Sequence, residues 1–227
     1  MDALTVSTST STSTSEAPAP ASAARTLATA QGAGLPAYVT PEQARAVIDA
    51  AARTRDRLLV ETLWQTGGRV SEVCRLKRSD VDRTEGALRL TNLKQRRPGR
   101  VKLVYVSPSL VAALLAYCQD AKIGPTGYVF ATSYRGALRP ITRQMAWKLV
   151  TGLAVKAGVA VVDTTTGQPR PATGLDFRHG AAVHQLRSGV PLSEVSQQLG
   201  HARVDNTMIY ARLTNAERRR YADRVAW

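Results

Sequence analysis

The chain has 227 residues, of which 44% are hydrophobic, and a formal net charge of +14 at pH 7. This length supports one sizeable core and argues against a second full domain. No apolar run approaches the roughly 18 residues of a membrane span. The two cysteines are far apart in the sequence and indicate neither a disulfide framework nor a zinc site. The charge indicates a polyanionic partner, nucleic acid before a membrane surface, and without a secretory signal pattern we expect a cytoplasmic, nucleoid-associated protein.

The first segment, residues 1–38, is rich in Ser, Thr, Ala, Pro and Gly and has no apolar periodicity. Such a segment cannot bury enough apolar surface to offset its ordering entropy, so we predict a disordered tail. Its charged residues are Asp2, Glu16 and Arg25, which sum to −1 and leave +15 on residues 39–227. The basicity therefore belongs to the predicted folded domain, 39–227.

Three helices are predicted at the start of this domain. Thr40, Pro41 and Gln43 form a capping-box pattern that predicts the first helix start. The segment "RDRLLVETLWQTGG" has an apolar stripe at helical spacing and ends in Gly67-Gly68, which predicts a second helix. The segment "RVSEVCRL" follows as a third.

A β-hairpin is predicted next, because "ALRLTNL" and "RVKLVYVS" alternate apolar and polar residues. Its connection is strongly cationic. The cations between residues 94 and 102, which include no acid, are Lys94, Arg96, Arg97, Arg100 and Lys102. They suit contact with a nucleic-acid backbone and predict steep salt dependence, although such a run also keeps a hairpin soluble.

Helices are predicted over much of the remaining domain, together with a loop over 159–173. The expected helices cover Ser107 to about 121, 142–156, 176–189, 191–200, 206–213 and about 215–225. We expect Trp64 and Trp147 in the core. The predicted fold class is mainly α with a small antiparallel β-sheet.

Five residues together form a set that can attack a phosphodiester without a metal: Arg69, Lys94, Arg178, His201 and Tyr210. A tyrosine oxygen can displace a strand end and hold the phosphate as an ester. Two arginines can grip the non-bridging oxygens, a histidine can add a hydrogen bond, and a lysine can protonate the leaving oxygen. No DxD, HExxH or carboxylate cluster indicates a metal site.

Four segments carrying these residues resemble the motifs of the tyrosine recombinases, or phage integrase family. "TGGRVSEVCRL" is similar to the first arginine box, with Arg69 and its supporting acid Glu72, and "LKQRRPGRVKLVYVS" is similar to the hairpin with its lysine, here Lys94. "LDFRHGAAVHQL" resembles the second box, with Arg178 followed by His179. "LGHARVDNTMIYARL" resembles the last, with His201 and Tyr210 nine residues apart.

The resemblance covers about residues 39–222 and implies the tyrosine recombinase catalytic-domain fold. It implies a site-specific recombinase that cleaves double-stranded DNA through a 3′-phosphotyrosine, releases a 5′ hydroxyl and rejoins strands without metal, ATP or any other cofactor. In the family the last helix docks on a neighbouring copy, which implies a homo-oligomer, a dimer or tetramer, on DNA.

Two departures from the family pattern stand out. Leu175 occupies the position where the second box usually has a histidine, and leucine can neither exchange a proton nor donate a hydrogen bond. Our hypothesis is that water, Lys94 or His179 supplies part of that role, or that the enzyme is slow; His179 also has the simpler interpretation of a structural histidine. The tail is too short and polar to be the family's N-terminal core-binding domain, so we expect a catalytic domain that binds weakly, uses a helper protein or suffices alone.

Two other functions remain open from the sequence. A type IB topoisomerase shares this chemistry but needs no defined site. A non-catalytic DNA-binding regulator derived from a recombinase would explain Leu175, whereas the retained Tyr210 argues against it. Taken singly, Tyr210 is an ordinary half-buried aromatic and the arginines ordinary surface cations, and only the set of four motifs indicates catalysis.

Overall fold

A computed structural model of the chain describes residues 36–92, 101–200 and 210. Its helices are α2 (Pro41–Asp49), α3 (Thr54–Thr66), α4 (Val70–Val73), α5 (Pro108–Asp120), α6 (Arg143–Lys156), α7 (Gly174–Arg187) and α8 (Leu192–Leu199), with a 3₁₀ turn at Arg78–Asp80. Its strands are β1 (Val81–Asp82), β2 (Ala87–Thr91), β3 (Val101–Tyr105), β4 (Ala131–Tyr134), β5 (Ala137–Pro140), β6 (Ala160–Val162) and β7 (Pro169–Pro171).

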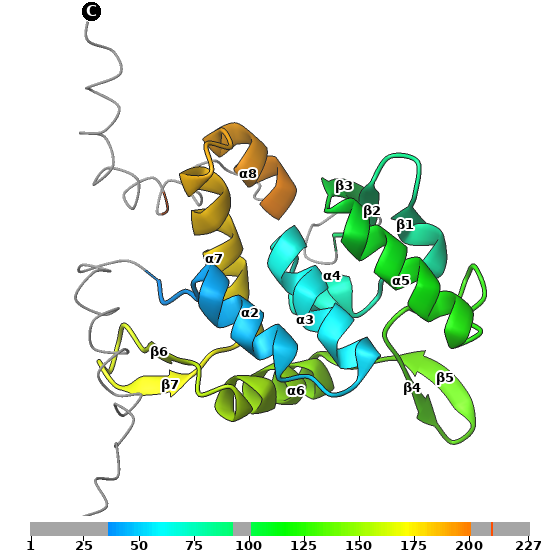
Figure 1. The fold of residues 1–227 in the computed structure, drawn as a ribbon, viewed down its shortest axis with the longest axis horizontal. Coiled ribbons are helices and arrows are strands. Elements are labelled where there is room, and N and C mark those ends of the chain that lie inside the picture. Colours follow the sequence, from blue (N-terminus) through cyan, green and yellow to red (C-terminus); the bar gives the residue numbers. More distant parts are fainter. Residues whose placement is uncertain (1–35, 93–100, 201–209, 211–227) are drawn as a thin grey trace, which may run out of the picture.

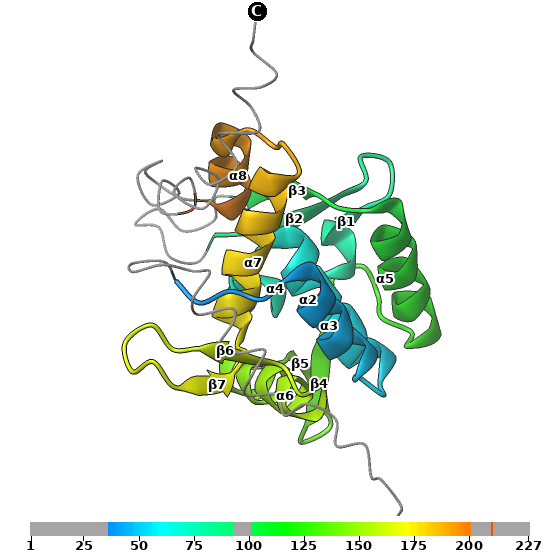
Figure 2. The same ribbon diagram turned by 60° about the vertical axis from the view of Figure 1, so that its left-hand side comes forward.

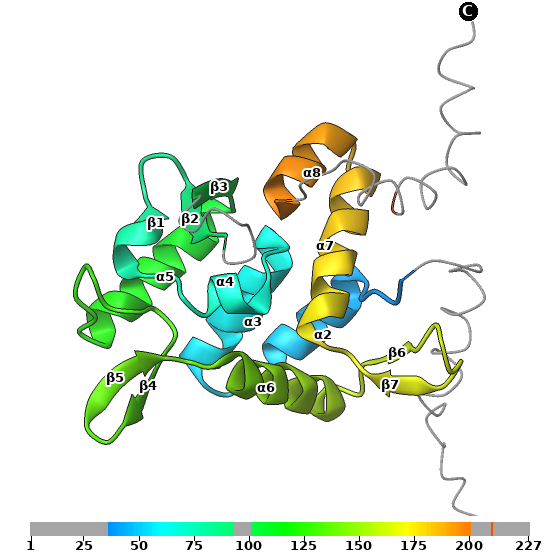
Figure 3. The same ribbon diagram turned by 180° about the vertical axis from the view of Figure 1, so that it is seen from behind.

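The fold is arranged around α3. Figures 1 and 3 show α7 and α8 on one side of it and the β1–β3 sheet with α5 on the other, while α6 runs beneath. Helix α3 packs against α2, α5 and α7, because its side chains at helical spacing, Leu58, Leu59, Thr62, Leu63 and Thr66, are all buried. The core continues into the sheet through Leu88 and Leu90.

The predicted fold class, mainly α with a small antiparallel sheet, is confirmed. Strands β1, β2 and β3 form one antiparallel sheet in that order, with Leu90 opposite Lys102. The capping box at Thr40 forms as expected, since the Thr40 side chain accepts from the Gln43 amide and the Gln43 side chain from the Thr40 amide. Gly67 ends α3 in the left-handed conformation.

Three expectations need correction. Residues 159–173 form the antiparallel pair β6–β7 rather than a loop, and β4–β5 is a further hairpin that the sequence did not indicate. Trp147 is 51% exposed rather than in the core. Ala37 and Tyr38, placed by sequence at the end of the tail, are buried, and the Val39 amide donates to the Asp176 carbonyl.

The predicted tail through residue 35, and the predicted helices over 206–213 and 215–225 apart from Tyr210, lie outside the described residues. Within the described part of the chain, no helix is long and apolar enough to cross a bilayer.

Candidate functional site

The first element of the site is the turn that joins α3 to α4. Gly67 has φ +56°, and a Cβ placed there would stand 2.8 Å from a methyl carbon of Leu199, so the close approach of α8 requires glycine. Arg69 follows as the N-cap of α4, whose first helical residue is Val70. Its Nη1 lies 2.8 Å from Glu72 Oε1, and its backbone amide donates to Glu72 Oε2. The backbone amide and the guanidinium of Arg69 are therefore both held by the carboxylate of Glu72.

Glu72 is buried and pairs with two cations. Besides Arg69, it binds Lys102 of β3, whose Nζ is 3.0 Å from Glu72 Oε2. Burial by itself raises the pKa of Glu72, but Lys102 and Arg69 outweigh it and hold that pKa below its usual value. The glutamate is therefore ionised at neutral pH and connects α4 to the sheet.

Lys102 is a protein-bound cation rather than one presented to solvent. Its side chain is 11% exposed, and its Nζ also donates to the carbonyls of Gln198 and Leu199 at 3.0 and 3.4 Å. Burial lowers the pKa of Lys102, and Glu72 opposes that shift. The sequence predicts a DNA contact by Lys102 along with the other hairpin cations. In the structure these contacts of the ammonium are to Glu72 and to the end of α8, because β3 packs against α8.

Arg178 brings α7 to the same place. Its Nη1 donates to the Gly67 carbonyl at 2.7 Å and its Nη2 to the Leu199 carbonyl at 2.9 Å. Burial and neighbouring Arg69 lower the pKa of Arg178 to about 10, so the group stays charged at pH 7. The Leu199 carbonyl thus accepts from Arg178 and from Lys102, and the C-terminal end of α8 holds both cations.

Tyr210 is buried against α7 and α8. It packs with a cluster that includes Val183, Val195 and Leu199, and its Oη lies 2.5 Å from His179 Nδ1. Burial raises the pKa of the Tyr210 hydroxyl, and Arg178 opposes this shift. Burial lowers the pKa of His179 to about 4, so the imidazole is neutral at pH 7, and in the tautomer with the proton on Nε2 its Nδ1 can accept the tyrosine hydrogen bond.

The two arginines line a cavity of about 560 Å³. Its walls come from α4, α6 and the start of α7: Arg69, Val70, Ser71, Arg143, Trp147, Thr173, Gly174, Leu175 and Arg178. Leu175 is 58% exposed and lies one turn before Arg178, on the same face of α7. Three guanidinium groups around one cavity suit a phosphate or another anion.

Several predicted site residues lie outside the described residues, namely Lys94, Arg96, Arg97, Arg100 and His201. The structure brings Arg69, Glu72, Lys102, Arg178, His179 and Tyr210 into one connected set. Leu175 shares the cavity with the arginines but makes no polar contact of its side chain, as its chemistry requires. In the described ranges no group of three or more His, Cys, Asp or Glu residues is placed to hold a metal ion.

Sequence reasoning missed the ion pair that anchors the start of α7. Arg170 of β7 pairs with Asp176 through both Nη atoms, at 2.7 and 2.9 Å, and Asp176 also accepts from the backbone and hydroxyl of Thr173. Figure 2 shows the β6–β7 hairpin beside this end of α7. The Thr-x-x-Asp spacing of a helix cap was the signal that could have predicted the Asp176 contacts, and nothing local indicated Arg170.

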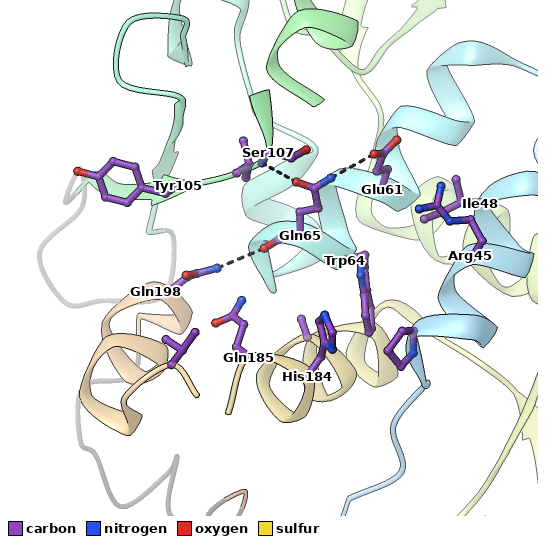
Figure 4. Close-up of a pocket in the computed structure, with 14 residues that line it drawn as sticks. Arg45, Ile48, Glu61, Trp64, Gln65, Tyr105, Ser107, His184, Gln185 and Gln198 are labelled. Carbon is purple, nitrogen blue, oxygen red and sulfur yellow. Dashed lines mark hydrogen bonds between the residues drawn. The ribbon is translucent and has the colours of Figure 1, made fainter. Parts of the chain in front are cut away.

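A second cavity, of about 590 Å³, lies between α2, α3, α7, α8 and the end of β3. Figure 4 shows Gln65 at its centre, accepting from the Ser107 amide, donating to Glu61, and accepting through its own carbonyl from Gln198. None of its lining residues lines the cavity at Arg69. It lies apart from the arginine site and holds none of the predicted catalytic residues.

Comparison with known proteins gives one family. The family model described as "Phage integrase family" matches residues 37–217. The tyrosine recombinase XerC of Roseiflexus sp. (strain RS-1) is 29% identical over 195 residues, covering 80% of this chain and 57% of the relative. Tyrosine recombinase XerA of Pyrococcus furiosus is 29% identical over 182 residues, covering 79% and 58%. The chain therefore spans less than three fifths of the length of these relatives.

Solved structures agree with the sequence matches. A crystal structure of XerA recombinase superposes with a TM-score of 0.67 at 28% identity, covering 86% of this chain and 68% of that one. The XerH site-specific recombinase bound to difH substrate, in a pre-cleavage complex, gives a TM-score of 0.62 at 22% identity, covering 81% and 52%. At that lower identity the second match shows the fold alone.

Proposed function

Because the chain belongs to the phage integrase family, we propose that it is the catalytic part of a site-specific DNA recombinase. The observation that carries the proposal is the convergence of Arg69 and Arg178 on one cavity, with Tyr210 close enough to Arg178 for the guanidinium to oppose the rise that burial causes in the pKa of its hydroxyl. These residues are distant in the sequence. Binding alone does not need a tyrosine hydroxyl beside a phosphate-binding arginine.

In the proposed reaction Arg69 and Arg178 hold the non-bridging oxygens of one phosphodiester. Tyr210 Oη attacks the phosphorus, a 3′-phosphotyrosine bond forms, and the bond to the 5′ oxygen breaks. Lys94 protonates that oxygen and His201 adds a hydrogen bond to the phosphate, as the family resemblance implies. The 5′ hydroxyl of a partner strand then reverses these steps, so the bond energy is retained and neither ATP nor a metal is required.

Glu72 and Lys102 support this proposal by fixing the first arginine. A guanidinium paired with a buried carboxylate keeps its direction before DNA arrives. Preorganised donors of this kind stabilise the charge that develops in the transition state, and the loss of one typically costs about 10²–10³ in rate. We therefore assign Glu72 a supporting role through Arg69 and not a proton-transfer role.

Among the described residues, His179 is placed to supply part of the role of the histidine that the family pattern has at Leu175. Its Nδ1 already meets the Tyr210 hydroxyl at 2.5 Å. A pKa of about 4 keeps the imidazole neutral and able to accept, while the negative phosphodiester would raise that pKa as DNA binds. We propose that His179 orients Tyr210 and takes its proton at the moment of attack.

The partners follow from the same proposal. Double-stranded DNA is the substrate, the hairpin cations Arg96, Arg97 and Arg100 contact its backbone, and the active form is a dimer or tetramer on DNA. A helper protein is a further proposal for tight binding, and a nucleoid address would follow from the DNA partner.

A covalent-trapping experiment tests the function. The protein is mixed with nicked suicide DNA that bears candidate inverted repeats, and a denaturing gel is examined for a protein–DNA band. We expect the band in the wild type and in Tyr134→Phe, an exposed tyrosine of β4, and its loss in Tyr210→Phe. Site-specific binding without a band would support a regulator instead, and relaxation of any supercoiled plasmid would support a type IB topoisomerase.

The role of His179 has its own test, because asparagine offers an acceptor near the position of Nδ1 but does not titrate. His179→Asn should keep tyrosine placement but cleave more slowly than the wild type, by about 10²-fold, while His179→Ala loses both. Wild-type cleavage by His179→Asn would reduce the role to orientation.

A further inference from the structure

The cavity at Arg69 and Arg178 has an apolar side as well as a cationic one. Trp147 of α6 and Leu175 of α7 line it, and both are more than half exposed. Large apolar side chains gathered at a concave surface indicate a ligand that covers them, because the exposure of Trp147 and Leu175 to water is unfavourable. We call Trp147 and Leu175 the apolar wall of the cavity. Its position beside the arginines indicates a ligand that has both a negative charge and an apolar surface.

The wall is built with a regular pairing on two packed helices. On α6, Arg143 and Trp147 are four residues apart and share one face; on α7, Leu175 and Arg178 are three apart and share one face. Helices α6 and α7 are in contact, and all four side chains line the same cavity. Each helix thus presents one guanidinium and one apolar side chain to the same space.

Duplex DNA offers one apolar surface next to each phosphate, the deoxyribose. The faces of the bases are covered by stacking, whereas the sugars are exposed along the backbone on either side of the phosphodiester. Phosphate oxygens would engage the guanidinium groups, and the adjoining sugar carbons would reach the apolar wall. Leucine is suited to such a sugar contact and unsuited to a phosphate contact.

Given the proposed function, in which this cavity holds a phosphodiester, we propose that Trp147 and Leu175 pack on the deoxyribose next to that phosphodiester and position it against Arg69 and Arg178. Arg143 binds a neighbouring phosphate. The two apolar residues are positioning residues, since they set where the phosphorus stands relative to the arginines. The contact is to the backbone, so it does not depend on DNA sequence.

A ¹⁹F NMR experiment tests the contact directly. The chain has three tryptophans, and 5-fluorotryptophan incorporated at all of them reports each one, with Trp147→Phe assigning the resonance of interest. Addition of a 30-base-pair duplex of arbitrary sequence should shift the Trp147 resonance and leave the partly buried Trp64 resonance in place. An unmoved Trp147 resonance under conditions where the duplex is bound would overturn the proposal.

Binding variants separate an apolar contact from an ionic or merely structural one. Trp147→Ala should weaken duplex binding by about tenfold, the equivalent of roughly 55 Å² of apolar surface, with no change in the slope of log K against log salt concentration. Trp147→Phe should restore most of the affinity, because it keeps a ring and loses only the indole N–H. Arg143→Ala should instead reduce the salt slope by about one.

The matched control is Val155→Ala, which removes an exposed apolar side chain from the same helix outside the cavity. It should leave affinity unchanged. Equal losses of duplex affinity in Val155→Ala and Trp147→Ala would contradict an apolar contact at the cavity. Tighter binding of a single-stranded oligonucleotide than of the duplex, with a larger shift of the Trp147 resonance, would assign the contact to an unstacked base instead. None of these measurements needs DNA cleavage. The proposed sugar contact can therefore be refuted while covalent trapping through Tyr210 succeeds, and it can be supported while covalent trapping fails.

Discussion

Replacing Lys102 with methionine should be among the most destabilising single changes in the chain. Methionine keeps much of the side-chain volume but removes the ammonium that pairs with Glu72 and donates to the Gln198 and Leu199 carbonyls. Glu72 then keeps Arg69 as its one ion-pair partner among the described residues, and its carboxylate stays buried. Breaking a buried ion pair by removing one partner costs about 3–5 kcal/mol.

Urea unfolding measures this loss. With a slope of about 2 kcal/mol per molar urea, the expected fall in the unfolding midpoint is about 1.5–2.5 M. Lys156→Met is the matched control, because Lys156 donates one exposed hydrogen bond to the Ala50 carbonyl, and its midpoint should move by about 0.5 M or less. In the double variant Glu72→Gln/Lys102→Met the losses of the two single variants should not add, since the double variant removes both charges of the pair and leaves neither buried without the other.

The same variant has a predicted pH dependence. The pKa of Glu72 is held below its usual value, so its pairing stabilises the fold above the unfolded pKa of about 4.3, and this contribution is lost as pH falls through the folded value. Removing Lys102 raises the folded pKa of Glu72. The difference in unfolding free energy between wild type and Lys102→Met should therefore be largest near pH 7 and shrink toward pH 3. A small, pH-independent difference no larger than that of Lys156→Met would refute the buried pair as an important contribution.

Two further changes test the turn and the cavity. Gly67→Ala should lower the free energy of unfolding in urea by about 2–3 kcal/mol, because it adds both backbone strain and a clash with Leu199. The control is Gly86→Ala: Gly86 has φ +64° and no atom lies within 4 Å of a Cβ placed there, so this variant should show only the strain of about 1 kcal/mol. Equal losses in the two variants would refute the clash. Leu175→His should accelerate covalent complex formation by about tenfold or more, since it adds a hydrogen-bonding and proton-exchanging group beside Arg178, while duplex binding weakens slightly as the apolar wall shrinks. A fall in the cleavage rate would contradict the idea that the site is merely handicapped by Leu175.

The sequence predicted those parts of the fold that are encoded locally. Thr40 with Gln43 and the glycine after Thr66 determine helix ends within a few residues, and the alternation in 87–91 and 101–105 determines a hairpin. The β6–β7 pair escaped prediction because "PRP" lacks the alternation of a strand and its partner is only three residues long. Trp147 is expected in the core because of its size, but it lies half-exposed on the face of α6 that lines the cavity.

For the proposed site, the sequence predicted the charged residues but not the protein groups that they contact. Arg69, Arg178 and Tyr210 could be predicted because each lies in a motif that occurs once, and the motifs follow one another in the order of the family that they resemble. The interpretation of Lys102 differed because its burial depends on α8, nearly one hundred residues later, whose end supplies two carbonyl acceptors. Long-range closure of this kind leaves no local pattern.

Three of the acceptors that hold the site are backbone carbonyls, those of Gly67, Gln198 and Leu199. A backbone carbonyl is present whatever side chain the residue carries, so substitutions at positions 198 and 199 can alter packing while leaving these acceptors in the chain. The acceptors that bind Arg178 and Lys102 therefore depend on the path of the main chain, and no side-chain substitution at positions 198 and 199 removes them. Replacing the amide group that contains the Leu199 carbonyl with an ester, which weakens the carbonyl as an acceptor without changing any side chain, is the chemical edit that reaches it.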